Sequence, residues 1–227
     1  MVAQAHALPD QLVTPFMLGV PKYADASQVM IAAEMSVKSG VMFVDGSTFS
    51  FNRKIDKAIR EAHTVYRPIA GRYLSAMPSD AVMGLFVNVD GNKFIELMRS
   101  NRSLQAMLAG INAAIDMDNI IKSVDGDMAV ITPKYLDDRL SMSMAAELAH
   151  AGWLSDVDYW KQSVPQGGRI VDWKENAYKY TDGKTTFCFG VSADRQFYSG
   201  SSPEDAMALL GQSETPISKA LQQKVKG

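Results

Sequence analysis

The sequence of 227 residues contains one cysteine, Cys188, and this scarcity excludes several kinds of site. A single cysteine forms no intramolecular disulfide and supplies no multi-cysteine metal centre. A lone thiol is ordinary in both oxidising and reducing compartments, so it does not indicate where the protein works. Because Cys188 lies between Phe187 and Phe189, we expect a small buried side chain rather than a nucleophile.

An excess of positive charge and long apolar runs are also missing. The chain has 23 basic and 25 acidic residues and a sequence pI of about 5.9. This balance provides no broad basic surface for nucleic acid. No apolar run approaches the roughly 18 residues of a membrane-spanning helix. We therefore expect no nucleic-acid partner and no transmembrane segment in this chain.

The sequence lacks the signatures of common catalytic sites. It contains no G-x-S-x-G nucleophile motif, no G-x-G-x-x-G motif and no phosphate-binding loop. Its three histidines are far apart and none lies in an H-E-x-x-H pattern. We expect no cofactor, and these absences favour a protein that is not an enzyme.

What the sequence does contain is a recurring order of strand, turn, strand and capped helix. It is clearest in residues 185–210, where Phe187, Phe189 and Val191 alternate with smaller residues before a turn and a return strand. The following Ser202-Pro203-Glu204-Asp205 is typical of a helix start, with serine as the cap and proline at the first position.

Two earlier stretches have the same order. In the first, apolar alternation over 29–37 predicts a strand, a return strand follows from Val41, and Asn52 is expected to cap a helix that ends near His63. In the second, Asp125-Gly126-Asp127 is expected to be a turn before a strand over 128–132, with a further strand over 140–148. A capping sequence over 155–158 predicts a helix there.

Three hairpin-plus-helix units indicate an α+β fold, with helices mainly on one face of an antiparallel sheet. We hypothesise that the units are diverged copies sharing one sheet. Residues 1–27 are expected to form an extended lead-in, with a short edge strand around 16–20. The chain is expected to be a single domain, 1–227, or a fragment of a longer protein, with a possible internal boundary near 66–78.

Four aspartates, Asp116, Asp118, Asp125 and Asp127, form the most suggestive acidic cluster. Oxygen ligands grouped within a dozen residues suit calcium or magnesium, which would allow a metal-assisted hydrolase. The spacing lacks the fifth-position ligand and the sixth-position glycine of an EF-hand loop. Helix capping and turn formation explain the same aspartates equally well.

Aromatic residues concentrate within 28 residues of the C-terminal half. If exposed, they would form a ligand-binding face for a sugar or peptide, and if buried, they would supply core area. The residues are Trp153, Tyr159, Trp160, Trp173, Tyr178 and Tyr180.

Four short motifs resemble a large uncharacterised lipoprotein family of anaerobic gut bacteria. They are Met77-Pro78-Ser79-Asp80 leading into GLFVNVDG, the helix end from Ile115 to Ile121, Ser123-Val124-Asp125-Gly126-Asp127 before a strand, and FGVSADRQFYSG followed by PEDA. The resemblance covers mainly 77–210. It implies a cell-envelope protein with an N-terminal lipid anchor, located in the periplasm or on the outer surface, with no family catalytic residues. The signal and the lipidated cysteine of the family are not in this sequence, so a cytoplasmic location stays an alternative.

These observations lead to three hypotheses about function. The first is a non-catalytic envelope domain that binds or scaffolds, with an envelope protein or a glycan as its partner. The second is a metal-assisted hydrolase that uses the four aspartates. The third is the capture of a partner through an open sheet edge, which main-chain pairing makes physically easy. The sequence leaves the oligomeric state open.

Overall fold

The computed structural model describes residues 2–8, 17, 19–38, 41–100, 115–134, 141–164 and 166–226. The chain folds as two compact units: unit 1 is Met1–Val65 with Glu96–Met107, and unit 2 is Tyr66–Ile95 with Leu108–Gly227. The first junction, Val65–Tyr66, adjoins the stretch near 66–78 where a boundary is expected. Each unit has its own antiparallel sheet together with helices, so the fold is α+β as predicted.

Unit 1 is built on a long hairpin. Strands β2 (Met30–Lys38) and β3 (Val41–Phe49) pair along their whole length, and β1 (Val2–Gln4) pairs with β2 over Met30–Ala32 alone. The sheet order is therefore β1-β2-β3. The helical segments of this part of the chain are η1 (Ala5–Ala7), η3 (Ala26–Gln28), α2 (Arg53–His63) and α3 (Gly91–Ser100), of which α3 lies partly in each unit.

Helix α2 begins where the sequence predicts. The Asn52 side chain accepts hydrogen bonds from the backbone amides of Lys54 and Ile55, which satisfies two of the amides left free at a helix start. Ile55 and Ile59 lie on the buried stripe of the helix. They form a core cluster with Ala5, Val20, Val29 and Ile31. Among the described side chains of the hairpin strands, Ile31 near the start of β2 is a buried member of this cluster.

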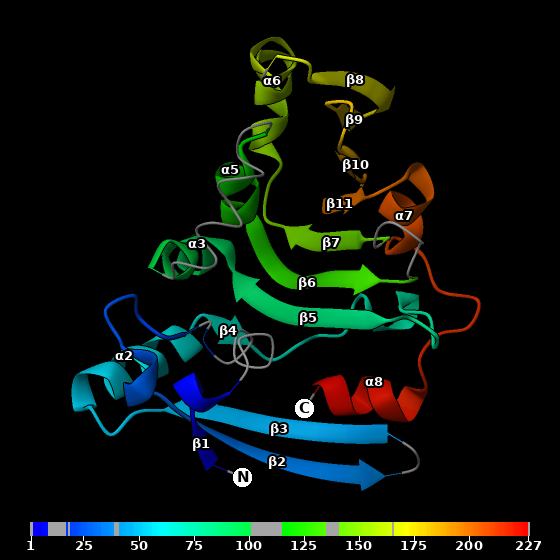
Figure 1. Ribbon diagram of the computed structural model, residues 1–227. Helices are drawn as coiled ribbons and strands as arrows, with labels where there is room; N and C mark the ends of the chain where they lie inside the picture. Colours follow the sequence, from blue (N-terminus) through cyan, green and yellow to red (C-terminus); the bar gives the residue numbers. More distant parts are fainter. Residues whose placement is uncertain are drawn as a thin grey trace. The chain divides into compact units, whose positions relative to one another are not determined.

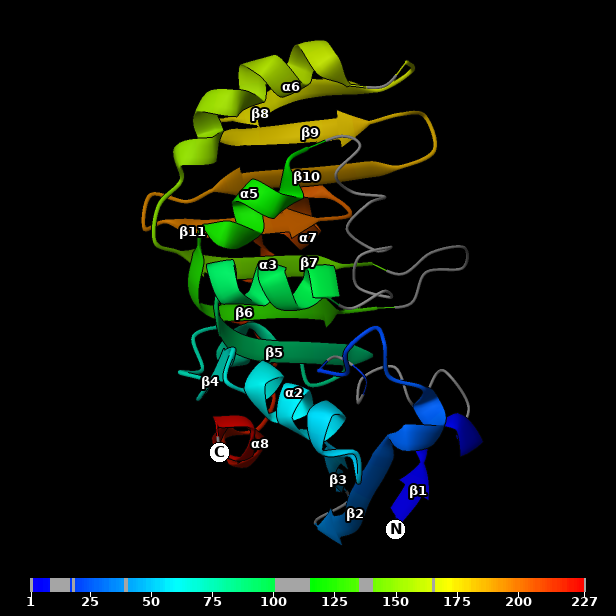
Figure 2. The same ribbon diagram turned by 90° about the vertical axis from the view of Figure 1, so that its left-hand side faces the viewer.

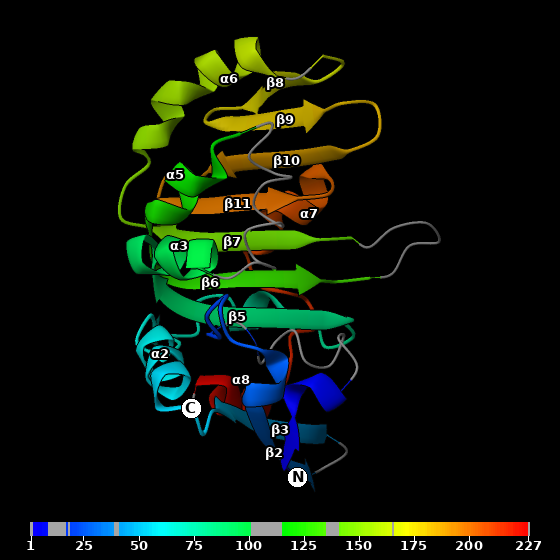
Figure 3. The same cartoon turned by 60° about the vertical axis from the view of Figure 1, so that its left-hand side comes forward.

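Unit 2 contains an eight-stranded antiparallel sheet in the order β4-β5-β6-β7-β11-β10-β9-β8 (Figures 1 and 3). Its strands are β4 (Tyr66–Arg67), β5 (Met83–Asp90), β6 (Val124–Thr132), β7 (Ser143–Leu148), β8 (Arg169–Lys174), β9 (Ala177–Thr181), β10 (Thr186–Val191) and β11 (Gln196–Gly200). Its helical segments are η4 (Leu74–Ala76), α5 (Met117–Lys122), η5 (Gly152–Asp156), α6 (Val157–Ser163), α7 (Pro203–Ala208) and α8 (Lys219–Lys226).

Helices cover the two faces of this sheet unequally. Figure 2 shows α5 and α6 in front of the sheet and α7 behind it. On the α6 side, Trp153 stacks on Trp160 and meets the edge of Phe197 from β11. On the α7 side, a core cluster joins residues of η4, β6 and β7 to a residue that follows α7; its buried members are Tyr73, Ala76, Ala129, Ile131, Ala145 and Leu209.

The third hairpin-plus-helix unit is confirmed in detail. Strands β10 and β11 pair with each other, and the Ser202 side chain accepts a hydrogen bond from the Asp205 amide at the start of α7, with Pro203 in the first helical position. The Cys188 thiol is buried, and this burial raises its pKa. A packed thiol of this kind is not a nucleophile.

The hypothesis that all three hairpins share one sheet is wrong. The hairpin β2–β3 forms its own sheet with β1, whereas β6–β7 and β10–β11 lie in the eight-stranded sheet, where β7 pairs with β11. Pairing between strands that follow each other in the chain, as in β10–β11, can be predicted from alternation and turn residues in a short window of sequence. Which hairpins become neighbours depends on pairing between residues far apart in sequence, which a local pattern does not encode.

Two smaller expectations also differ from the structure. The lead-in forms its strand at Val2–Gln4, whereas Met17, Gly19 and Val20 lie outside strands, and Phe16 and Leu18 lie outside the described residues. The capping sequence over 155–158 does not cap α6: the 3-10 turn η5 runs directly into the helix, and Asp156 makes no side-chain cap. Among the helices in the described ranges, none combines the length and apolar character needed to cross a membrane.

Candidate functional site

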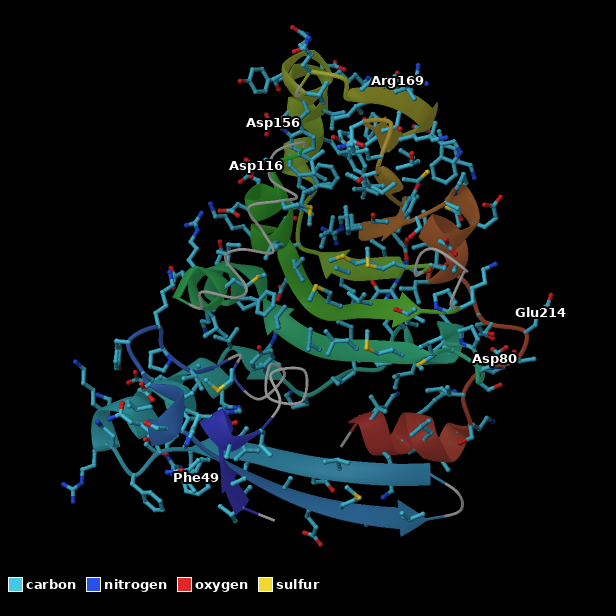
Figure 4. All side chains as sticks on the ribbon, viewed as in Figure 1. Phe49, Asp80, Asp116, Asp156, Arg169 and Glu214 are labelled. Carbon is cyan, nitrogen blue, oxygen red and sulfur yellow. The ribbon has the colours of Figure 1, made fainter. Side chains whose placement is uncertain are left out.

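The structure separates the four aspartates of the predicted metal cluster. Asp116 precedes α5 and its side chain accepts a hydrogen bond from the Asn119 amide, so it serves as the helix cap (Figure 4). Asp118 lies in the first turn of the same helix. Within the described part of the chain, no group of three or more His, Cys, Asp or Glu side chains is arranged to hold a metal ion.

The other two aspartates belong to strand β6, and the turn predicted for Asp125-Gly126-Asp127 is wrong. Asp125 forms an exposed ion pair with Arg67 at 2.7 Å. Asp127 is buried, with 2% of its surface exposed. The sequence resembles a turn because it contains a bulge: β6 has a register shift opposite β7, and Gly126 has a φ of +143°, which favours glycine.

The buried carboxylate of Asp127 binds a distant loop. It accepts hydrogen bonds from the amides of Ala70 at 2.9 Å, Gly71 at 2.6 Å and Arg72 at 2.8 Å, and from the Asn88 side chain at 2.8 Å. The three amides are successive in the chain and more than fifty residues from Asp127. The carboxylate therefore holds the start of the η4 segment against the sheet.

A chain of polar contacts extends from Asp127 across the neighbouring strands. Glu147 on β7 accepts a hydrogen bond from the Asp127 amide at 2.8 Å, and Arg72 forms an ion pair with Glu147 at 3.4 Å. Arg72 also pairs with Asp194, which in turn accepts a hydrogen bond from Gln196 on β11. We call Arg72, Asn88, Asp127, Glu147 and Asp194 the Asp127 cluster.

The electrostatics of the cluster suit anchoring better than catalysis. Burial by itself raises the pKa of the Asp127 carboxyl, but the hydrogen bonds from the Arg72 and Ala70 amides, Asn88 and Gly71 hold that pKa below its usual range. A carboxylate with a lowered pKa has little affinity for a proton at neutral pH, which makes it a poor general base. The nearby Tyr73 has its pKa raised, first by burial and then by the charge of Glu147.

The six aromatic residues do not form one surface. Trp153, Trp160 and Tyr180 are buried. Tyr178 faces Phe189, whereas Trp173 packs on the opposite side of the sheet against a cluster that includes Cys188. Tyr159 is exposed. Most of these aromatic side chains thus contribute to the core. A ligand-binding face stays a prediction for the exposed part of the group, which includes Tyr159.

The hairpin of unit 1 has an apolar face that becomes exposed along its length. On β2, Ile31 is 1% exposed, whereas Met35 and Val37 on the same face are 64% and 67% exposed. Met35 is the direct cross-strand partner of Val44 on β3, which is 51% exposed. We call Met35, Val37 and Val44 the hairpin surface. Its alternation is that of a strand packed on a core, yet the described residues of unit 1 leave these three side chains mostly exposed.

Strand β3 forms one edge of this sheet. It is the last of the described strands in the order β1-β2-β3, and the residues from Val44 to Ser47 are all exposed. Unpaired amides and carbonyls along an edge strand are a template for pairing with another chain. Figure 4 marks Phe49 at the end of β3, where the strand approaches the core of unit 1.

The opposite face of the hairpin carries two acids side by side. Glu34 and Asp45 are direct cross-strand partners, and both are exposed. We call them the acid pair. Among the described side chains, neither has an ion-pair partner within 4.0 Å. Like charges placed directly opposite each other destabilise an antiparallel pair.

Sequence reasoning missed Arg72, Asn88, Glu147 and Asp194 of the Asp127 cluster. One signal was present at β7 and just before it, where the positions alternating with the apolar ones are Ser141, Ser143 and Ala145. Small side chains at alternate positions indicate that the second face of a strand is also covered, and all three residues are buried. A glutamate that continues such a face is expected to be enclosed and paired.

Comparisons with known proteins show one distant structural similarity and no similar family or curated sequence. No protein-family model matches the chain, and no curated protein sequence matches it. The chain is similar to the solved structure titled "Structure of crystal form IV of TP0453", with 9% sequence identity and a TM-score of 0.35, over 73% of this chain and 54% of that chain. This chain thus matches about half the length of that protein. A similarity at this TM-score carries no argument about function.

Proposed function

We propose that this chain is a non-catalytic binding module that captures an extended segment of a partner protein on the β3 edge of its hairpin. The observation that carries the proposal is the combination of an exposed apolar row, Met35, Val37 and Val44, with the outer edge of β3, the last described strand of its sheet. An added strand gains main-chain hydrogen bonds from the edge, and its alternate side chains extend the apolar row.

The stability of the folded chain does not explain why the side chains of the hairpin surface are exposed. Burial of apolar area contributes roughly 25 cal/mol per Å² to folding, so side chains left in water add nothing to it. Exposed apolar patches on soluble proteins mark interaction sites, and an exposed edge strand adds an aggregation hazard. A partner strand would remove both penalties at once.

The candidate catalytic groups support a binding role. Asp116 and Asp127 are engaged with backbone amides, and Asp125 with Arg67. The single thiol, Cys188, is enclosed in the core. These residues therefore maintain the fold, whereas the hairpin surface makes no comparable contribution to the core of unit 1.

Selection from random displayed peptides of roughly eight residues, about the length of an edge strand, tests the proposal. The full chain is used as bait, and amide hydrogen exchange then locates the bound peptides. We expect selected peptides to slow exchange in β3, and the V37S/V44S variant to lose binding. The V82S/V171S variant is the matched control, because it removes two exposed valines of unit 2. Selected peptides that protect β8 instead, or a failure to enrich any peptide, would contradict the proposal.

We also propose, from the family resemblance, that the chain works in the cell envelope. An envelope partner would then meet the hairpin outside the cytoplasm. Fractionation of the native cells with an antibody against this chain tests the location. Recovery with the envelope fraction is expected, and recovery with the cytosol would contradict this part of the proposal without affecting the binding role of the hairpin.

A further inference from the structure

We infer that the segment taken up by the β3 edge is a cationic strand, with lysine or arginine alternating with apolar residues. This inference rests on the proposed function and adds the chemistry of the partner. It depends on the acid pair, Glu34 and Asp45, which lies on the face opposite to the hairpin surface.

The register places the acids where an added strand would meet them. Asp45 is on β3, so a residue of the incoming strand becomes its direct neighbour, about 5 Å away between Cβ atoms. Glu34 lies one strand further on the same face, within reach of a long side chain. A basic residue at this position would lie beside Asp45 with its long side chain within reach of Glu34, so one positive charge would offset the repulsion between the two acids. The acid pair is thus unfavourable in the free hairpin and favourable in the complex.

The other face requires the opposite chemistry. Side chains of the incoming strand alternate between the two faces, so the neighbours of the basic residue extend the row that contains Val44. That row is already apolar, and Met35 lies next to Val44 on the inner strand. Apolar residues at alternate positions would therefore bury the hairpin surface while the basic residues contact the acids.

A second copy of this chain and a lipid surface fit the hairpin less well. An added β3 strand from another copy would bring a second acid pair to the same face, which places four like charges close together. Elements that lie on anionic membranes carry lysine and arginine on their polar face, whereas the charged side chains described on this face of the hairpin are Glu34 and Asp45. The charge of the acid pair thus selects a basic protein strand.

Three synthetic peptides of roughly eight residues test the inference against the full chain. They alternate valine with lysine, serine or glutamate, and hydrogen exchange in β3 reports where each binds. We expect the lysine peptide to bind about 5-fold tighter than the serine peptide, and the glutamate peptide to bind weakest. The preference should fall between about 0.05 M and about 0.5 M salt, because screening weakens exposed pairs.

The E34Q/D45N variant tests whether the acids cause the preference. We expect it to bind the lysine and serine peptides equally, whereas E175Q/E214Q, which removes two exposed acids of unit 2, keeps the preference. Equal binding of the lysine and serine peptides to the unaltered chain would overturn the inference and leave the proposed function standing. A different outcome is that E34Q/D45N self-associates while the unaltered chain binds the lysine and serine peptides equally. The acids would then serve only to prevent pairing between copies of this chain, and the inference would be overturned. If no peptide, and only vesicles of phosphatidylglycerol, slowed exchange in β3, the proposed function itself would fail.

Discussion

The Asp127 cluster and the β2–β3 hairpin place carboxylates on strands in opposite ways. Asp127 is buried and accepts four hydrogen bonds, three of them from successive amides of a distant loop. Glu34 and Asp45 are exposed, face each other, and have no ion-pair partner among the described side chains. The Asp127 carboxylate thus finds its hydrogen-bond donors within the chain, whereas the acid pair would gain an opposite charge only when a basic strand binds beside it.

Apolar residues differ between the two regions in the same way. Ala129, Ile131 and Ala145 near the Asp127 cluster are all almost fully buried under η4 and the end of the α7 segment. Met35 and Val37 on the hairpin are mostly exposed, although their alternation is just as regular. Alternation of apolar residues along a strand therefore predicts which face of the strand is apolar. Whether that face is buried depends on which other elements pack against it in the folded chain.

Removal of the Asp127 carboxylate should have the largest effect on stability. We expect D127A to lower the free energy of unfolding by about 3 kcal/mol, because it leaves three partly buried amides and Asn88 without their acceptor. Denaturant titration followed by circular dichroism measures the change. D125A is the matched control on the same strand. The ion pair between Asp125 and Arg67 is exposed, so its removal should lower the free energy of unfolding by about 1 kcal/mol or less. Equal effects of the two substitutions would contradict the anchoring role.

A side chain at Gly126 should have the next largest effect. We expect G126A to destabilise the fold by about 2 kcal/mol, because a Cβ would lie 2.6 Å from the Glu147 carboxylate and the φ of +143° is strained for alanine. G183A is the control for the backbone alone: Gly183 also has positive φ, but a Cβ there meets nothing within 4 Å. It should lose about 1 kcal/mol. A G126A variant as stable as G183A would show that Glu147 moves away freely.

Acid should weaken the Asp127 cluster to a smaller extent than deletion of the carboxylate, because a protonated carboxyl still accepts hydrogen bonds. The folded-state pKa of Asp127 lies below its unfolded value of about 3.9, so its stabilisation is fully present above that pH and is lost as pH falls through the folded pKa. Unfolding of the D127N variant should therefore depend less on pH below about 4 than unfolding of the unaltered chain. Identical acid profiles would contradict this assignment.

Substitution of the hairpin surface should change stability least. We expect V37S/V44S to alter the free energy of unfolding by about 0.5 kcal/mol or less, because both side chains are mostly in water already. I31A, on the same face of β2, should lose about 3 kcal/mol because Ile31 lies in the core of unit 1. Thermal melting compares the two. A large loss in V37S/V44S would mean that the hairpin surface contributes to folding and is not reserved for a partner.

Local features of this fold could be predicted from the sequence because their causes are local. Asn52 caps α2 and Ser202 caps α7 through amides two or three residues away. The Asp182-Gly183 pair, a typical hairpin-turn sequence, is another local feature: the Asp182 side chain accepts hydrogen bonds from the amides of Lys184 and Thr185. Such contacts leave a clear pattern in a short window of sequence.

The Asp127 cluster could not be predicted, because its partners are distant. Asp125-Gly126-Asp127 has the composition of a turn, and only the amides of Ala70 to Arg72 show that Asp127 is an anchor within a bulged strand. The separation of the hairpins into two sheets depends on long-range pairing in the same way. The acid pair is a cross-strand contact, which the sequence shows only once the hairpin register is known.

Hydrogen exchange of the full chain, with and without the lysine–valine peptide, tests the central claim most directly. The account predicts that the peptide slows amide exchange over 44–47 of β3, and that the amides of Ala70 to Arg72, which are already bonded to Asp127, stay unchanged. Protection confined to the Asp127 cluster or to β8, with β3 exchanging as fast as before, would contradict the claim that the hairpin is the binding surface.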